Sequence, residues 1–320
     1  MITRADVDEA AQRTAGLTRL TPVLQADPGA FPGDVWFKCE FLQHTGTFKA
    51  RGALNRLLAS KERGELKADV GVVVASGGNA GLANAYAAAQ LGVPATVFVP
   101  AAAPAVKVRR LEAIGATVIQ GGAEYAVAYQ AAVAHAQETG AVYCHAYDQP
   151  EIAAGAGTVG TELLEQIAGV DTVLVAVGGG GLMAGIAAAV EGHAKVVGVE
   201  PENAPTLHAA LAAGEPVDVA VSGVAADSLG ARCIGDIGFS VAVRAGVVSV
   251  LVSDADIVAA CSLLWNDYRI MVEHGAAAAY AALTSGAYTP KTGERVAVVL
   301  CGANTDPATF QEGQPGPVKE

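Results

Sequence analysis

The sequence is poor in charged and aromatic side chains, and each shortage excludes a class of protein. Only 16% of its 320 residues are charged, 5% are aromatic, and the formal net charge is −12. The longest basic run, Lys-Val-Arg-Arg at residues 107–110, makes one turn of a helix. A phosphate backbone or an anionic membrane surface needs a cluster of Lys and Arg. We therefore expect no nucleic acid and no membrane among the partners.

The sequence also lacks paired cysteines and long apolar runs. Its five cysteines are scattered, odd in number and without Cys-x-x-Cys spacing, at Cys39, Cys144, Cys233, Cys261 and Cys301. This favours a reducing compartment and argues against a structural zinc site. No apolar signal segment follows the first residues, and no apolar run approaches the ~20 residues that span a bilayer. We therefore expect a cytoplasmic location.

Hydrophobic residues (52%) and glycine (38 residues) are abundant. The length predicts about two domains, and the composition suits a parallel α/β fold whose strands are buried on both faces. Short apolar runs predict strands at 72–75, 95–99, 117–119, 172–177, 196–199 and 295–300. Helical segments separate them, among them 79–91, 105–114 and 182–190. This alternation predicts two parallel α/β units with a ligand cleft between them, and a disordered tail after residue 310.

Four short segments carry the candidate chemistry, because ligands of such sheets bind at the carboxyl ends of the strands. In the first, Lys49 lies between Phe48 and Ala50 at the start of a helix. A lysine amine becomes a nucleophile when burial lowers its pKa, although a solvated side chain is the simpler interpretation. The second, Ala-Ser-Gly-Gly-Asn-Ala-Gly at 75–81, follows a strand and opens a helix, so its backbone N–H groups would bind an anion.

The third segment is a run of four glycines at 178–181, just before a helix. Such a run allows an anion to approach the backbone closely, unless it is only a tight turn. It lacks the Gly-Lys-Ser/Thr ending of a P-loop, and Met183 occupies the place of the third glycine of a dinucleotide site. A monophosphate therefore fits better, which disfavours a nicotinamide oxidoreductase. The fourth segment, Leu-Cys-Gly-Ala-Asn at 300–304, ends a late strand.

In this order and at these separations, the four segments resemble the fold-type II pyridoxal-phosphate (PLP) enzymes. The likeness is greatest to the branch of serine/threonine dehydratases and serine racemases, and it runs from Thr21 to Asn304. It implies an α/β fold of two parallel-sheet domains with the tryptophan synthase β-like architecture. Residues 1–69 and 149–320 would form the large PLP-binding domain, and residues 70–148 a small mobile domain.

The resemblance implies how the cofactor is held. Lys49 would form a Schiff base with PLP and act as general base at the substrate Cα. Phe48 would pack beside the ring, Asn79 would bond the 3′-hydroxyl, and Cys301 would lie against the pyridine nitrogen. The 5′-phosphate would be bound by Gly178, Gly179, Gly180, Gly181 and Leu182. Because a thiol is neutral, the ring would be a weaker electron sink than beside aspartate, which favours β-elimination over transamination.

The resemblance also implies the reaction, the dehydration and deamination of a small β-hydroxy amino acid such as L-threonine or L-serine to a 2-oxo acid and ammonia. Ser76, a second catalytic candidate, would hold the substrate carboxylate together with backbone amides around Gly77, Asn79 and Ala80. Gly77 occupies the place of a serine in serine racemases, which disfavours racemisation. A racemase, a β-replacing lyase of the same fold, and a non-catalytic phosphate- or PLP-binding regulator remain alternatives.

Further features follow from the same resemblance. Glu200, Ala204 and Thr206 align with a cation site, and the neutral Thr206 favours a monovalent ion such as potassium, or none. The alternative is that Glu200 only caps the next helix. Asp227 falls near the substrate, where a carboxylate disfavours 3-hydroxyaspartate. We also expect a homodimer, and at this length no regulatory domain of the biosynthetic threonine dehydratases.

Overall fold

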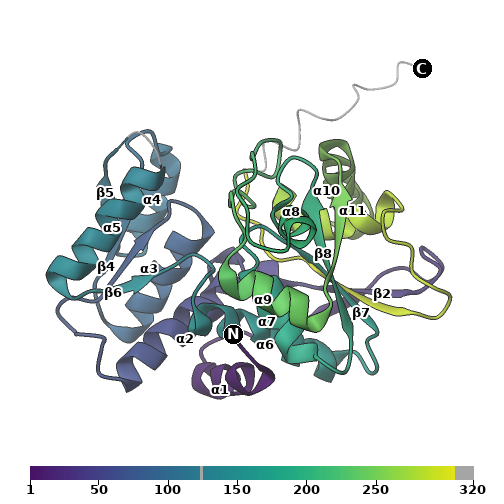
Figure 1. Cartoon of the computed structure of the whole chain (residues 1–320), viewed down its shortest axis with the longest axis horizontal. Helices are drawn as coiled ribbons and strands as arrows, with labels where there is room; N and C mark the ends of the chain where they lie inside the picture. Colours follow the sequence, from purple (N-terminus) through teal and green to yellow (C-terminus); the bar gives the residue numbers. More distant parts are fainter. Residues whose placement is uncertain (123–124, 307–320) are drawn as a thin grey trace.

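The computed structural model describes residues 1–122 and 125–306, which build two sheets side by side (Figure 1). The larger sheet has the strand order β1-β2-β10-β7-β8-β9, and the smaller sheet has the order β5-β4-β3-β6. The predicted disorder after residue 310 lies outside the described residues. Among the helices of the described part, none is long and apolar enough to cross a membrane.

The large sheet takes its strands from both ends of the chain. They are β1 (Val23–Gln25), β2 (Asp34–Lys38), β7 (Thr172–Ala176), β8 (Lys195–Pro201), β9 (Val248–Val252) and β10 (Arg295–Val299). All neighbours pair in parallel except β1, which runs antiparallel to β2. The loop between these two strands is too short for the crossover that a parallel pair needs. This edge strand differs from the parallel pattern expected from the sequence.

The small sheet is parallel throughout and contains only residues 72–144. Its strands are β3 (Val72–Ala75), β4 (Ala95–Val99), β5 (Thr117–Gln120) and β6 (Val142–Cys144). Val72 and Val74 belong to one hydrophobic cluster and Val73 to another, on opposite faces of the sheet. Successive side chains of a strand point to opposite faces, so a strand that is buried on both sides needs an unbroken apolar run.

Helices cover both faces of the small sheet. They are α3 (Asn79–Leu91), α4 (Ala105–Ala113) and α5 (Tyr125–Thr139). Leu82 of α3 packs in the cluster of Val72, whereas Ala128 and Ala132 of α5 pack in that of Val73. Helix α3 and strand β4 have the predicted bounds, because the apolar run of each is followed at once by a breaker, glycine or proline.

Helices also cover both faces of the large sheet (Figure 1). On one side α11 (His274–Thr284) packs along β7 to β10, backed by α10 (Asp254–Tyr268). The other helices that pack around this sheet are α1 (Arg4–Thr14), α6 (Pro150–Gln166), α7 (Gly181–Val190), α8 (Thr206–Ala213) and α9 (Asp236–Ala245). Helix α2 (Lys49–Glu62) contacts α3 beside the small sheet and α6 beside the large one. Its first residue therefore lies between the two units.

Candidate active site

The first and fourth sequence segments lie against each other. Thr47 forms an isolated antiparallel bridge with Gly302, and the backbone N–H of Phe48 donates to the carbonyl of Cys301 at 3.0 Å. Asn304 adds a side-chain contact, since its Nδ2 donates to the carbonyl of Thr45 at 2.8 Å. The short 3-10 helices η1 (Glu40–Leu42) and η2 (His44–Gly46) lead the chain from β2 to this point.

The backbone just before α2 is strained. Thr45 has φ 63° and Gly46 has φ 73°. A left-handed conformation is an outlier for a β-branched residue such as threonine, and it persists only where the surroundings enforce it. The hydrogen bond from Asn304 to the Thr45 carbonyl supplies part of that constraint. The turn before Lys49 is thus held in part by a contact with the fourth segment.

Lys49 is the first residue of α2, and its Nζ donates to the carbonyl of Ala146 at 2.7 Å. Burial lowers the pKa of this amine to about 8, although the nearby Cys301 and Glu273 act in the opposite direction. A larger fraction of neutral, nucleophilic amine is therefore present near pH 7 than for an ordinary lysine.

Arg51 anchors the same end of α2. Its side chain is fully buried, with Nη2 at 2.7 Å from Glu40 Oε1 and Nη1 at 2.6 Å from Glu162 Oε1. Glu162 belongs to α6, so the guanidinium joins α2 to a helix of the large unit. Removal of one partner from such a buried ion pair is costly, because it leaves the other charge uncompensated. Arg51 therefore holds Lys49 in place through the helix.

The glycine run packs against Tyr147, the residue that follows the hydrogen-bond acceptor of Lys49, Ala146. A Cβ placed on Gly179 would lie 2.3 Å from the tyrosine ring. A Cβ on Gly181 would meet the Tyr147 carbonyl at 2.6 Å, and Gly180 has φ 85°. Only glycine fits these positions. The run ends at the N-terminus of α7, whose first N–H groups have no acceptor within the helix and favour an anion.

The second segment opens α3 but is less tightly packed. A Cβ on Gly78 would meet nothing within 4 Å, and one on Gly77 would lie 3.3 Å from Val99 Cγ1. The Oγ of Ser76 accepts a hydrogen bond from the N–H of Gly78 at 3.3 Å. Ala80 is buried in the first turn of the helix. Gly77, Gly78 and Asn79 line the cleft, and the first N–H groups of the helix provide a second place for an anion.

A buried carboxylate connects the second segment to the fourth. Asn79 Nδ2 donates to both oxygens of Glu273, at 2.8 and 3.1 Å, and Asn79 Oδ1 accepts from Asn304 Nδ2 at 2.7 Å. Glu273 is only 8% exposed, and burial raises the pKa of its carboxyl. These contacts fix which end of the Asn79 amide carries the nitrogen. Neither Glu273 nor Asn304 was among the predicted site residues, and only the position of Asn304 after the late strand hinted at a role.

Cys301 lies at the end of β10, next to the lysine. Its side chain is buried, and burial, followed by the negative charge of Glu273, raises the pKa of the thiol. The sulfur therefore stays neutral at physiological pH. A neutral thiol is a weak donor and acceptor, and its role beside the cofactor ring stays a prediction.

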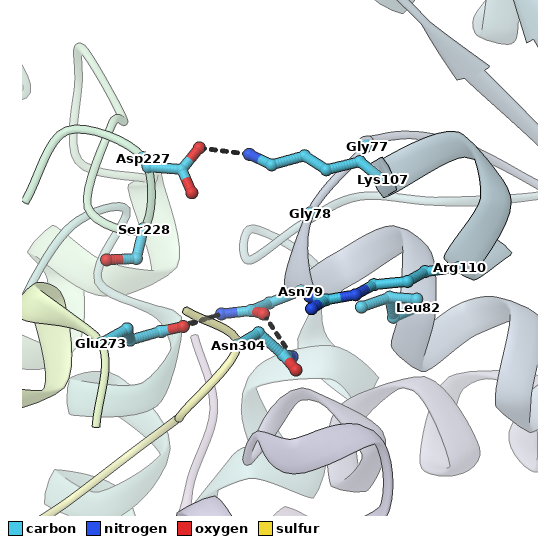
Figure 2. A pocket seen from close by; sticks show the side chains of 10 residues that line it. All are labelled: Gly77, Gly78, Asn79, Leu82, Lys107, Arg110, Asp227, Ser228, Glu273 and Asn304. Atoms are coloured by element: carbon cyan, nitrogen blue, oxygen red, sulfur yellow. Dashed lines mark hydrogen bonds and ion pairs between the residues drawn. The ribbon is translucent and has the colours of Figure 1, made fainter. Parts of the chain in front are cut away.

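The second and fourth segments line a pocket between the two sheets, whereas Lys49, Cys301 and the glycine run are not among its lining residues (Figure 2). Its lining residues come from both units and are Gly77, Gly78, Asn79, Leu82, Lys107, Arg110, Asp227, Ser228, Glu273 and Asn304. Figure 2 shows two contacts across this space, Asn79 with Glu273 at one level and Lys107 with Asp227 at another. Four lining residues, Gly77, Gly78, Asn79 and Asn304, belong to the segments singled out in the sequence.

The three residues of the expected cation site have other contacts here. The carboxylate of Glu200 accepts the backbone N–H groups of Leu207 at 2.6 Å and His208 at 2.9 Å, at the start of α8. Thr206 Oγ1 donates to the carbonyl of Gly178 at 2.5 Å, and the carbonyl of Ala204 accepts the Thr206 N–H at 3.1 Å. Glu200 thus caps a helix. In the described part of the chain, no group of three or more His, Cys, Asp or Glu could hold a metal ion.

Comparison with known proteins assigns the family. A family model described as "Pyridoxal-phosphate dependent enzyme" matches residues 15–302, and the chain belongs to this family. The residues present fit the cofactor, because an amine with a lowered pKa bonds the carbonyl of Ala146, and the next residue, Tyr147, packs against a glycine run that has no room for a side chain.

Curated relatives and solved structures narrow the branch. The L-threonine ammonia-lyase of Geobacter sulfurreducens is 39% identical over 279 residues, which cover 86% of this chain and 68% of that protein. The phenylserine dehydratase of Ralstonia pickettii is 38% identical over 297 residues, covering 91% and 90%. The structure of maize serine racemase matches with a TM-score of 0.88 at 30% identity, covering 97% of this chain and 96% of the racemase. The predicted family and fold class are confirmed.

Proposed function

We propose that this enzyme is a PLP-dependent ammonia-lyase that acts on a small β-hydroxy amino acid such as L-threonine or L-serine. For threonine the products are 2-oxobutanoate and ammonia, since water is lost in the elimination and taken up again in the final hydrolysis. Relatives named threonine ammonia-lyase, phenylserine dehydratase and hydroxyaspartate ammonia-lyase support this class of reaction.

One observation carries the proposal, the juxtaposition of Lys49 with the glycine run. Lys49 Nζ bonds the carbonyl of Ala146, and the next residue, Tyr147, packs directly against Gly179 and Gly181. An amine and a phosphate cradle so connected match a ligand that carries both an aldehyde and a phosphate. When bound, PLP supplies the electron withdrawal that acidifies the substrate Cα.

Lys49, Phe48 and Cys301 have separate roles in the proposed reaction. The lowered pKa of Lys49 lets the amine exist in its neutral form, which can take the proton from Cα. Phe48, whose ring centroid lies 5.0 Å from Nζ, shields the amine from water. The neutral thiol of Cys301 would leave a pyridine nitrogen held beside it unprotonated, which would favour loss of the β-hydroxyl over amine transfer.

The substrate carboxylate has its place at the start of α3. We assign it to the N–H groups of the turn from Ser76 to Ala80, because the helix N-terminus stabilises negative charge there. Asn79 lies in the same turn, oriented by Glu273. Under this assignment the substrate carboxylate lies in the pocket of Figure 2, whose lining includes Gly77, Gly78 and Asn79.

The racemase alternative is weaker for a reason visible in the pocket. Gly77 lines the pocket and has no side chain that could return a proton to the opposite face of Cα. Elimination needs only the single base, Lys49. A β-replacing lyase would consume an added thiol such as sulfide and would not release a 2-oxo acid. Measurement of 2-oxo acid release with and without sulfide therefore distinguishes this alternative.

The Lys49→Ala variant tests the proposal. Purified wild-type protein supplied with PLP is expected to show a visible absorption band and to release 2-oxobutanoate from L-threonine. The variant is expected to lose the band and at least about 10³-fold in kcat, because both the covalent attachment and the base are gone. Lys61→Ala, an exposed lysine on the same helix, is the matched control.

The same measurements separate the alternatives. A protein that binds PLP with an unchanged spectrum after Lys49→Ala would be a cofactor-binding regulator and not an enzyme. A panel of serine, threonine and phenylserine then ranks the substrates. Retention of 2-oxo acid release in the variant would refute the role of this lysine outright.

A monovalent cation near Glu200, Ala204 and Thr206 stays a prediction. The hydrogen bonds of Glu200 to the first N–H groups of α8 support the capping alternative more directly. Replacement of potassium by tetramethylammonium in the assay distinguishes them, since a cap predicts unchanged activity and a bound ion predicts its loss.

The assembly and location are proposed on independent grounds. We propose a homodimer in the cytoplasm, with residues 70–148 as a mobile small domain inserted into the large one. The five cysteines are free, which suits a reducing compartment. The exposed Leu20, Leu24 and Leu42 offer apolar surface to a second copy. Light scattering on the purified protein measures the oligomeric state directly.

A further inference from the structure

The chain passes from β6 to α6 through residues 145–149, which join the small unit to the large one. The carbonyl of Ala146 in this segment accepts the hydrogen bond of Lys49 Nζ at 2.7 Å. The ring and the carbonyl of the next residue, Tyr147, pack against the glycine run. The shape of this one turn therefore determines the surroundings of both the amine and the proposed phosphate site.

His145 closes this turn with its side chain. Its Nδ1 accepts the backbone N–H of Asp148 at 2.8 Å and that of Tyr147 at 3.2 Å. A ring nitrogen that accepts N–H groups carries no proton, so the imidazole is neutral and its proton is on Nε2. Asparagine and aspartate close turns in the same way, because their side chains accept an N–H group two residues further on. The histidine thus takes the place of the usual turn-closing side chain.

The surroundings of the imidazole favour this neutral form. Burial, the largest cause, lowers the pKa of His145, and the nearby Lys49 adds to this, while Asp148 acts in the opposite direction. The rings of Tyr147 and Tyr129 pack edge-on against the imidazole, with centroids 4.6 and 6.5 Å away. Tyr129 belongs to α5, so the histidine is held by side chains of the small unit as well as by the turn itself.

The far end of the turn is fixed to the large unit. The carboxylate of Asp148 accepts the backbone N–H groups of Asp236 at 3.2 Å and Ile237 at 3.1 Å, in the first turn of α9. The preceding Gly235 donates its N–H to the carbonyl of Gly179 at 3.1 Å. The turn and the glycine run therefore share a neighbour, and a change in the fold of the turn reaches the run from two sides.

We propose that His145 is a positioning residue of the cofactor site and acts by closing this turn. Its Nδ1 keeps the Ala146 carbonyl at Lys49, and through the same contacts it keeps Tyr147 against the glycine run. The inference rests on the proposed function, in which Lys49 attaches PLP and the glycines bind its phosphate. Without the acceptor, two N–H groups of a part-buried turn lose their partner, which favours other conformations of the turn.

Two substitutions separate the acceptor from the ring. His145→Asn removes the imidazole, but its Oδ1 can accept the same N–H groups, whereas His145→Leu removes the acceptor at similar volume. We expect His145→Leu to weaken PLP binding about tenfold or more, and His145→Asn to stay within about threefold of wild type. Dialysis of each holoenzyme against decreasing PLP, followed by absorbance, measures the affinity. His193→Leu is the control, since the exposed His193 contacts Arg4 and the Glu191 carbonyl away from the turn.

Nitrogen-15 NMR of the wild-type holoenzyme reports the tautomer directly. The His145 signals are identified by their absence in His145→Asn, and we expect the proton on Nε2 with Nδ1 as acceptor. A proton on Nδ1 would overturn the proposal, even where His145→Leu fails to fold.

The affinities decide the rest. Equal weakening in the Leu and Asn variants would show that the ring packs but does not act as the acceptor, and an unchanged affinity in His145→Leu would exclude a positioning role. Wild-type enzyme that binds PLP without eliminating water from threonine would refute the proposed function alone, because the comparison of variants measures cofactor binding and not turnover.

Discussion

The two glycine turns of this protein share a local design but differ in what lies behind them. Both follow a parallel strand and open a helix, at residues 76–81 in the small unit and 178–181 in the large one. Tyr147 packs against the large-unit turn and leaves no space for a Cβ at Gly179 or Gly181. In the small-unit turn Gly78 borders open space, whereas Gly81, already within α3, has no room for a Cβ against the Ser76 carbonyl.

The difference shows how one local motif serves two purposes. A turn that is packed from behind is rigid, so its N–H groups are preorganised for a ligand that remains bound, such as a phosphate. A turn that faces open space can adapt to a substrate that enters and leaves. The packed turn belongs to the unit that also contributes Lys49 and Cys301, whereas the open turn belongs to the unit across the cleft.

The largest expected effect comes from filling the packed turn. Gly179→Ala would place a methyl group 2.3 Å from the Tyr147 ring, so the ring or the loop must move. We expect a loss of about 1–3 kcal/mol in the free energy of unfolding and at least about tenfold weaker PLP binding. Urea denaturation and absorbance titration with PLP measure the two quantities.

Gly78→Ala is the matched substitution in the open turn. Nothing lies within 4 Å of the new Cβ, and the φ of this residue is −110°. The unfolding free energy should change by less than about 0.5 kcal/mol, with PLP affinity unchanged. Equal losses in the two variants would abolish the distinction between the turns.

A second prediction concerns the pKa of the Lys49 amine and not the packing of the glycine run. Burial lowers the pKa of Lys49 to about 8. The fraction of neutral amine therefore rises about tenfold per pH unit below that value and levels off above it. The rate of PLP uptake by apoenzyme should follow the same curve between pH 6 and 9, as measured by stopped-flow absorbance. A rate that keeps rising toward pH 10.5 would mean that the amine has the pKa of an exposed lysine.

A third prediction concerns the carboxylate that ties the open turn to the large unit. Glu273→Gln keeps the volume but allows the Asn79 amide to rotate, because a glutamine can present nitrogen as well as oxygen. We expect a fall of about tenfold in kcat/KM and a shift in the pH midpoint of the cofactor absorbance.

The exposed Glu202 provides the comparison for that variant, as Glu202→Gln removes a charge without any contact to Asn79. Recovery of the spectral midpoint in Glu273→Asp would support a positioning role. An unaltered midpoint in Glu273→Gln, with lower stability alone, would reduce Glu273 to a structural residue.

Much of this architecture was predictable because its signals are local. Helix 79–91 and strand 95–99 follow from apolar periodicity bounded by glycine and proline, and Lys49 and the glycine run stand out by residue type. The roles of Tyr147 and Glu273 had no such signal. Each depends on a partner far away in the chain, and nothing in the residues around them indicates that partner.

The sequence by itself determined the strands β3, β4, β5, β7, β8 and β10, the helices α3, α4 and α7, and the four segments that a phosphate-bearing aldehyde would need. Turns and periodic runs of this kind are encoded by neighbouring residues. Only the tertiary structure decided which glycine turn is packed and which is open, that Glu273 orients Asn79, and that Lys107 meets Asp227 across the cleft. These contacts join residues from both units, so they arise only when the two sheets are placed side by side.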